Sequence, residues 1–190
     1  MNTLNTTEIP GYVAGTWNID PVHSDVSFTV RHMMVSKVRG HFEKFSGQIV
    51  TADDPFESTV VAVVDATSFN TNNVDRDNHI RSADFLEVDK YPTLEFRSTG
   101  LRARGGADYA LDGELTVHGV TRPVTFLLEL NGFTKDPYGG YRVGLSATTD
   151  ITRSDFGVSI NIPMEGGGVV VGDKVQVSLE LEAVLDTPAS

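Results

Sequence analysis

Cysteine is absent from the 190-residue chain, and positively charged residues are scarce. Without cysteine, the chain has no disulfides, no thiol nucleophile and no cysteine-based zinc or iron–sulfur site. Fifteen Lys and Arg residues stand against 26 Asp and Glu residues, which gives a formal net charge of -11. Nucleic acids and anionic membrane surfaces are bound through clustered cations, so this charge disfavours both as partners.

Long apolar runs are also lacking. No stretch approaches the ~20 apolar residues that an integral membrane helix needs. The first eight residues have neither the basic cluster nor the apolar run of a secretory signal, so we expect a cytoplasmic location. Composition is otherwise that of a globular protein. It predicts one domain over residues 13–186, with a flexible N-terminal segment over 1–12 and a C-terminal tail over 187–190.

What the chain does contain is period-two alternation of apolar and polar residues. The clearest run ends the domain, from Val175 to Leu185, and similar runs lie near 26–32, 58–67, 94–97, 111–117, 124–130 and 143–151. Residues 38–51 are typical of a long curved strand, with Gly40 and Gly47 as candidate bulges or bends. About eight strands separated by turn compositions predict an all-β antiparallel barrel or sandwich.

An eight-stranded barrel can be filled by its own side chains or can hold one small ligand. The inward positions include four small residues, which favour a cavity: Ala62, Ala66, Ala147 and Ala183. Periodicity alone leaves a solid barrel open, because small residues can face bulky ones across the interior. The glycine-bearing stretch 153–172 is too long for a hairpin turn and suits a flap over a barrel mouth.

One polar stretch, residues 76–86, interrupts the β pattern. Asn72 and Asn73 can cap a helix, Asp75 and Asp77 suit its positive end, and Pro92 stops it. We therefore expect one short α-helical insert near residues 73–90. His79 and Arg81 are candidate contacts to a polar headgroup, although Asp75 and Asp77 precede them by four residues and can instead pair with them.

Five histidines raise the question of a metal site, but no two have the spacing of a metal-binding pair. No serine-nucleophile motif or phosphate-binding loop occurs. We therefore expect no metal and no cofactor. An enzyme that uses His79, Asp77 or His32 as an acid or base remains an alternative. A structural or interaction protein with a solid barrel is a second alternative.

Several ordered motifs resemble the YceI-like family. They are HSDVSFTVRH at 23–32, VRGHFEKFSG at 38–47, the insert with the Tyr-Pro pair at 91–92, GELTVHGVTRPV at 113–124, RSDFG at 153–157 and GDKV at 172–175. The resemblance spans nearly the whole domain. It implies a lipocalin-like eight-stranded antiparallel barrel with an elongated apolar tunnel, an α-helical insert and often a homodimer. It also implies no bound metal and no established catalytic activity.

Family members are described as binding polyisoprenoids or other long-chain lipids. We therefore expect non-catalytic binding, sequestration or transport of a polyisoprenoid, an isoprenoid-quinone tail or a fatty acid or amide, which would be a small-molecule partner able to co-purify with the protein. A buried chain contributes about 0.8 kcal/mol per methylene group. The residues predicted to line the tunnel are Phe28, Val30, Phe42, Phe45, Val64, Phe85, Leu86, Phe96, Leu115, Phe126, Leu128, Phe156 and Leu179.

Overall fold

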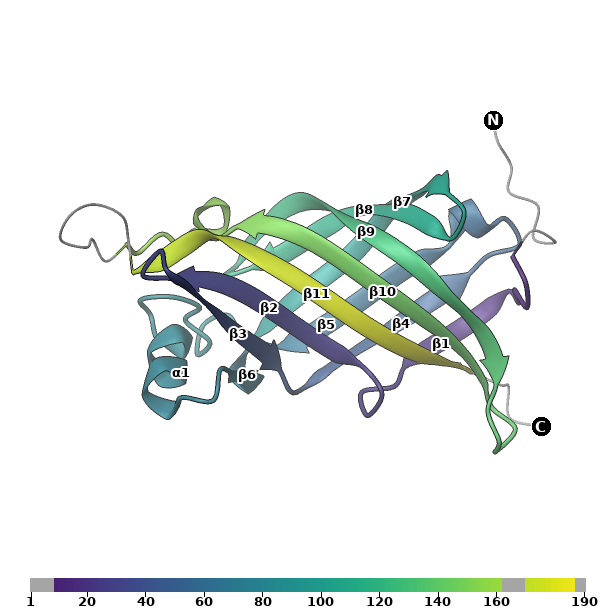
Figure 1. The fold of residues 1–190 in the computed structure, drawn as a ribbon, viewed down its shortest axis with the longest axis horizontal. Coiled ribbons are helices and arrows are strands. Elements are labelled where there is room, and N and C mark those ends of the chain that lie inside the picture. The colour runs from purple at the N-terminus through teal and green to yellow at the C-terminus, as the bar shows by residue number, and fades with distance from the viewer. Residues whose placement is uncertain (1–8, 162–169, 187–190) are drawn as a thin grey trace.

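The alternating runs of the sequence form eleven antiparallel strands in the computed structural model, which describes residues 9–161 and 170–186 (Figure 1). The strands are β1 (Gly15–Ile19), β2 (Asp25–His32), β3 (Ser36–Phe42), β4 (Phe45–Thr51), β5 (Thr59–Asp65), β6 (Phe69–Asn70), β7 (Thr93–Gly105), β8 (Asp108–Val117), β9 (Val120–Lys135), β10 (Tyr141–Thr152) and β11 (Val171–Leu185). One α-helix, α1 (Val74–Arg81), lies between β6 and β7. Three single turns of 3-10 helix accompany them: η2 (Pro55–Glu57), η3 (Ala66–Ser68) and η4 (Arg153–Phe156).

The sheet closes on itself. Its order is β1-β4-β5-β7-β8-β9-β10-β11, and β11 pairs back with β1, where Trp17 faces Leu185. The predicted eight-stranded antiparallel barrel is therefore confirmed. Closure removes the unpaired edges that an open sheet would present at these strands.

The other three strands continue members of the ring. β11 pairs with β1 through residues 183–185 and with β2 through residues 175–180, so β1 and β2 are two halves of one interrupted strand. β3 and β4 are related in the same way, as are β5 and β6. The interruptions bend these strands. The predicted long strand over 38–51 is thus two strands that meet at residues 43–44.

Gly40 and Gly47 do not form bulges, contrary to the expectation from sequence. Gly40 keeps regular register opposite Phe28, and Gly47 stays in register opposite Ala62. A β-carbon at position 40 would lie 2.4 Å from the Phe28 ring, and one at position 47 would lie 2.7 Å from the side chain of Ile19. These glycines leave room for inward side chains of the neighbouring strands.

The helical insert is confirmed, with α-helix in only its first half. Asn73 caps α1 by accepting a hydrogen bond from the backbone N–H of Arg76, as its residue type predicts. The helix ends at Arg81. Residues 82–90 form turns whose backbone N–H groups bond back to the helix, including Leu86 to Ile80 and Val88 to Arg81. This returning segment places apolar side chains against the barrel end.

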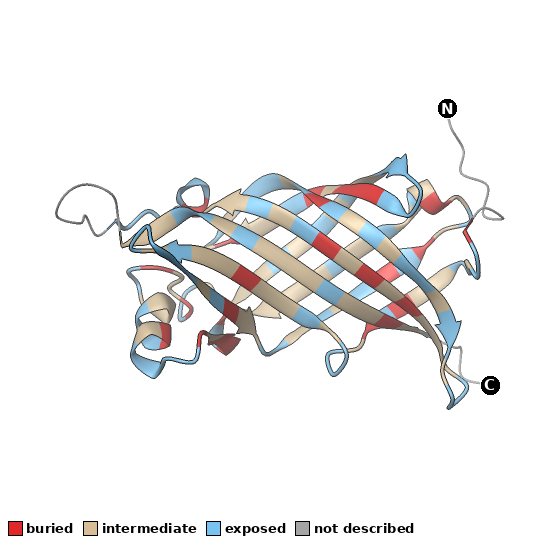
Figure 2. Ribbon diagram, in the orientation of Figure 1, coloured by how far each residue is buried: buried red, intermediate tan, exposed pale blue. Residues whose placement is uncertain are grey.

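The buried residues concentrate along the barrel interior, while exposed positions alternate with them on the outer face (Figure 2). At the end away from α1, Trp17 is fully buried and packs with Ile49, Val143, Leu145 and Ala183. The expected flexible segments lie mostly outside the described residues and stay predictions. Within the described part, Ile9 is buried, and the Tyr12 hydroxyl donates to the carbonyl of Ala52 at 2.6 Å.

Candidate functional site: an apolar cavity in the barrel

The barrel is hollow. A cavity of about 260 Å³ runs from the middle of the barrel to the α1 end. Among the described residues, its surface is formed by apolar atoms. The volume is several times the ~30 Å³ that one water molecule occupies in the liquid. The alternative of a solid barrel is therefore wrong.

All thirteen residues predicted from the sequence to face a ligand line this cavity. They come from nearly every strand of the barrel, and Phe85, Leu86 and Phe156 come from the segments that cover its end. Their placement is a geometric fact, and their contact with a ligand stays a prediction. Of the four small inward residues, Ala62 and Ala147 line the cavity, whereas Ala183 packs in the Trp17 core.

At the end of the barrel away from α1, the rings of Trp17, Phe133 and Tyr141 form an aromatic plug. The ring of Trp17 packs against Phe133 at 5.4 Å and Tyr141 at 5.7 Å between centroids. Its indole N–H donates to the Thr51 hydroxyl at 2.8 Å, so its polar group is satisfied inside the core. A second, smaller apolar cavity of about 80 Å³ lies at this end, and Ile49, Leu128 and Leu145 line both cavities.

The other end is covered by two separate segments. Phe85, from the turns after α1, and Phe156, from η4, are both nearly fully buried. His118, in the turn between β8 and β9, joins these segments. Its Nδ1 lies 3.2 Å from the carbonyl oxygen of Phe156, and its Nε2 lies 3.5 Å from the Glu87 carboxylate.

The sequence reasoning missed Phe69, which lies at the same end. Phe69 stacks on Phe28 at 5.1 Å between centroids and meets Phe42 edge-on at 5.7 Å. It belongs to β6, a strand of two residues between η3 and the loop before α1. So short a strand shows no alternation, which is why the pattern gave no signal for it.

Arg153 is the second residue that was missed. It is 7% exposed and lines the cavity, although charged residues are rarely buried. Its guanidinium donates to the carbonyl oxygens of Val158 at 2.7 Å and Gly172 at 3.0 Å, and also to Asn161 and Val171. Burial lowers the pKa of this guanidinium, and nearby Asp173 opposes that shift. Arg153 therefore ties η4, the chain after it and the start of β11 into one rim.

Neither headgroup candidate lines the cavity in the described part of the chain. His79 lies on the outside, 3.0 Å from the Asp84 carboxylate, and its ring meets the outer side of Phe85. Arg81 donates to the backbone carbonyls of Thr67 and Phe69. The helix returns toward η3 and β6, so Arg81 anchors the insert to them.

The alternative of ion pairs within the helix, Asp75 with His79 and Asp77 with Arg81, is not formed among the described residues. Asp77 is buried and accepts hydrogen bonds from both the backbone N–H and the hydroxyl of Thr71. It therefore fixes the loop before α1, and Arg81 turns elsewhere. Spacing along a helix identifies only neighbours within the helix. Asp77 and Arg81 instead bond to residues outside it.

The acid–base groups proposed for an enzyme are not assembled at the cavity. Asp77 bonds to Thr71, His79 pairs with Asp84, and His32 ends β2. None of the three is among the described residues that line the cavity.

Within the described part of the chain, no cluster of three His, Asp or Glu side chains could hold a metal ion. No helix there has the length and apolar character needed to cross a bilayer.

A closed eight-stranded barrel with an apolar interior, plugged at one end and covered by an insert at the other, defines a lipocalin-like barrel. The family comparison is more specific. The chain belongs to the YceI-like domain family, whose sequence model matches residues 17–183.

Curated relatives support this assignment. A UPF0312 protein of Vibrio cholerae is 39% identical over 141 residues, covering 73% of this chain and 74% of the relative. A UPF0312 protein of Vibrio parahaemolyticus is 37% identical over 163 residues, covering 85% and 82%.

Solved structures share the fold. The YCEI protein of Campylobacter jejuni superposes with a TM-score of 0.71 at 26% identity, covering 83% of this chain and 90% of that one. Burkholderia cenocepacia BcnA gives 0.72 at 23% identity, covering 86% and 98%. A polyisoprenoid-binding domain from Saccharophagus degradans gives 0.69 at 18% identity, covering 92% and 100%.

Proposed function

We propose that this protein binds one long-chain apolar molecule inside the barrel and sequesters or carries it without chemical change. The observation that carries the proposal is the cavity itself, which is lined by apolar atoms from the middle of the barrel to the α1 end. The ligand class is a polyisoprenoid, an isoprenoid-quinone tail or a fatty acid or amide. The description of the Saccharophagus degradans domain as polyisoprenoid-binding supports the first of these.

The energetics suit such a ligand. Each methylene group moved from water into the cavity contributes about 0.8 kcal/mol, so a chain can bind tightly with few polar contacts. Aromatic rings supply much of the lining, and Phe96 and Phe126, 5.2 Å apart between centroids, pack edge to face in the cavity wall. An apolar wall distinguishes chain lengths weakly, since one methylene is worth only about 1–3 kcal/mol in a fitted pocket.

Native mass spectrometry of protein purified from its own cells tests the proposal. We expect a bound long-chain lipid that organic extraction releases unchanged. An empty protein that also takes up no polyprenyl or fatty-amide probe would overturn the proposal. Release of a chemically altered probe would instead show turnover.

A pair of neighbouring residues makes a matched test of the site. Phe126 lines the cavity, whereas Leu127 points outward and is 47% exposed. We expect Phe126→Gln to lower probe uptake at least tenfold, because it places an amide in an apolar wall. Phe28→Gln should act in the same way, and Leu127→Gln should leave uptake unchanged. Filling the cavity with Ala147→Phe should also block uptake.

Two further features of the protein stay proposals. Cell fractionation tests the cytoplasmic location, with the protein expected inside the cell and not in the secreted fraction. Analytical ultracentrifugation tests the homodimer, with a sedimenting species of twice the chain mass expected.

A further inference from the structure

The turn between β2 and β3 has an unusual backbone and unusual side chains. Its two central residues, Met33 and Met34, have φ values of 52° and 63°, and the Val35 N–H bonds to the His32 carbonyl oxygen. Positive φ at both central residues is the conformation of a type I′ turn, for which Asn-Gly is strongly preferred. Methionine at these positions strains the backbone.

The strained positions are apolar and exposed. Met33, Met34 and Val35, which we call the β2–β3 tip, are 42%, 49% and 86% exposed. The fold gains little from the exposed parts of these apolar side chains, Val35 above all, and Asn-Gly would suit the backbone better. Their placement therefore points to an apolar partner.

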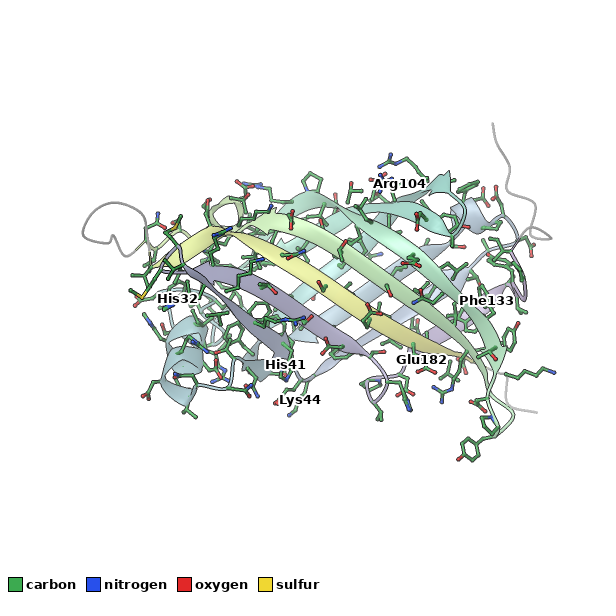
Figure 3. The ribbon with its side chains drawn as sticks, in the orientation of Figure 1. His32, His41, Lys44, Arg104, Phe133 and Glu182 are labelled. Carbon is green, nitrogen blue, oxygen red and sulfur yellow. The ribbon has the colours of Figure 1, made fainter. Side chains whose placement is uncertain are left out.

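The β2–β3 tip extends directly from the cavity wall. Val30 and Val171 line the cavity, and Val171 pairs with His32, where the turn begins. Figure 3 places His32 near the end of the barrel where the cavity is covered, whereas Phe133 lies at the opposite end. A surface that received the tip would thus lie beside the end from which a ligand enters.

Three cations stand behind the tip on the outer face. Arg31, Lys37 and Arg39 are exposed; Arg31 pairs across the strands with Lys37, and Arg39 pairs with Thr29. Among the described residues, none of the three forms an ion pair. The net charge of -11 is an average over the chain, and it hides this local group.

We propose that the β2–β3 tip inserts into a membrane surface rich in anionic lipids, with Arg31, Lys37 and Arg39 facing the headgroups. Apolar area buried in the interface and nearby cations are two contributions that hold peripheral proteins on such membranes. The exposed tip and its three cations are the observations that support membrane docking. Its purpose, loading or unloading the chain held in the cavity, rests on the proposed function.

A second copy of the chain fits this surface less well. In the described part of the chain, β3 pairs with β6 only at His41 and Phe42, so its Ser36–Gly40 edge has no outer strand partner. Antiparallel pairing of two such edges would set Lys37 and Arg39 of one copy among the same cations of the other. Like charges across a strand pair are destabilising, whereas an anionic surface complements them.

Vesicle flotation tests the proposal. We expect the full chain to float with vesicles that contain phosphatidylglycerol and to float much less with pure phosphatidylcholine. The double variant Met33→Asn/Met34→Gly should lose this binding. Because Asn-Gly suits the turn, the double variant should fold at least as stably as the parent, which separates lost docking from lost folding.

The controls use the rest of the barrel. Tyr138, which is 94% exposed in the turn between β9 and β10, is an apolar tip at the other end, and Tyr138→Asn should change nothing. Replacing Arg31, Lys37 and Arg39 by Gln should weaken binding by about fivefold per charge. The matched triple Gln variant at exposed Arg97, Arg102 and Arg104 of β7 has the same net charge and should bind as the parent does.

Several outcomes would overturn the proposal. They are failure of the parent to float, full binding by the double variant, equal loss in the two triple variants, or conversion of a dimer to a monomer by the double variant. The cavity-filling variant Ala147→Phe should still float while it takes up no lipid probe. A variant that floats normally but takes up no probe is therefore defective in the cavity alone. A variant that takes up the probe but does not float is defective in the β2–β3 tip alone.

Discussion

The two ends of this barrel are built from similar residues but packed differently. At the Trp17 end, aromatic rings from β1, β9 and β10 pack against one another and leave a cavity of only about 80 Å³. At the α1 end, Phe28, Phe42 and Phe69 line the wall of a cavity, and Phe85 and Phe156 cover it. Aromatic content therefore does not decide how large a cavity an end encloses. The two ends differ in where the aromatic side chains come from. At the Trp17 end they come from the barrel strands, whereas at the α1 end the covering residues come from separate segments that lie across the barrel.

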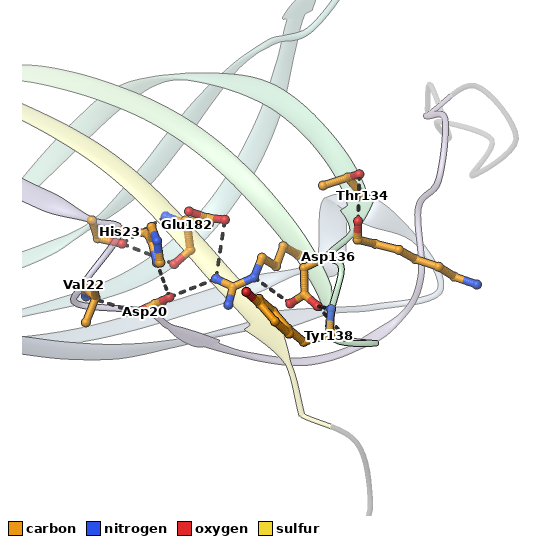
Figure 4. Close-up of polar contacts among 11 residues, drawn as sticks. Asp20, Val22, His23, Thr134, Asp136, Tyr138 and Glu182 are labelled. Carbon is orange, nitrogen blue, oxygen red and sulfur yellow. Dashed lines mark hydrogen bonds and ion pairs between the residues drawn. The ribbon is translucent and has the colours of Figure 1, made fainter.

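The polar groups follow the same division. At the Trp17 end, Arg142 bonds to Asp20 and Asp136, each at 2.9 Å, and lies 3.4 Å from Glu182 (Figure 4). This network joins charged side chains of both signs on β10, β11 and the adjoining loops. At the α1 end, Arg153 and Arg81 bond mainly to backbone carbonyls. The first network locks strands together, whereas the second holds covering segments in place.

The largest effect is expected from removing the plug. Trp17→Ala should lower the free energy of unfolding by about 3–5 kcal/mol, because a fully buried ring leaves a void. Urea unfolding measures the change. Trp17→Phe, which keeps a ring but loses the bond to Thr51, should cost less. Equal losses from the two variants would show that the hydrogen bond, and not the ring, closes this end.

At the other end, Arg153→Gln should destabilise less and affect the ligand more. We expect a loss of about 1–3 kcal/mol, since several carbonyl oxygens lose their donor. We also expect faster release of a bound probe, because the rim over the cavity loosens. Stopped-flow dilution of a fluorescent lipid measures the release. Unchanged release would mean that Arg153 serves folding alone.

Acid should weaken the Arg142 network at the Trp17 end. Hydrogen bonds from Arg142, and then from His23, lower the pKa of Asp20 from 3.8 to about 2. A carboxyl group with a lowered pKa in the folded state stabilises the fold above its unfolded pKa, and this contribution disappears as pH falls toward 2. The difference in Tm between the parent and Asp20→Asn should therefore shrink between about pH 4 and pH 2. Parallel Tm curves for the two proteins would contradict this role.

The smallest effect is expected at His79. Its pairing with Asp84 is exposed, and such pairs contribute about 0–1 kcal/mol. His79→Ala should change stability by less than about 0.5 kcal/mol and leave lipid uptake unchanged. Isothermal titration with a polyprenyl probe measures the uptake. A large loss would return His79 to the headgroup role that the sequence suggested.

Prediction from the sequence succeeded where the backbone has a fixed period. In a strand, alternate side chains face one side, so an apolar residue such as Leu115 or Leu179 could be assigned to the interior before the barrel was known. Prediction failed for Phe69, on a strand of two residues, and for Arg153, whose charge argues for exposure. It also failed for the partners of Asp77 and Arg81, because both bond to residues outside the helix.

The sequence by itself determined most of the strands and their inward faces, an asparagine cap at the start of the helix, and the family. These follow from local period, local hydrogen bonding and ordered motifs. Only the tertiary structure decided that the larger cavity lies toward α1 and that only a small one remains near Trp17. It also decided that strained methionines project beside the covered end. Whether side chains fill a barrel depends on how residues far apart in the sequence pack across its interior. The spacing of residues along the chain does not give the distances between them in space.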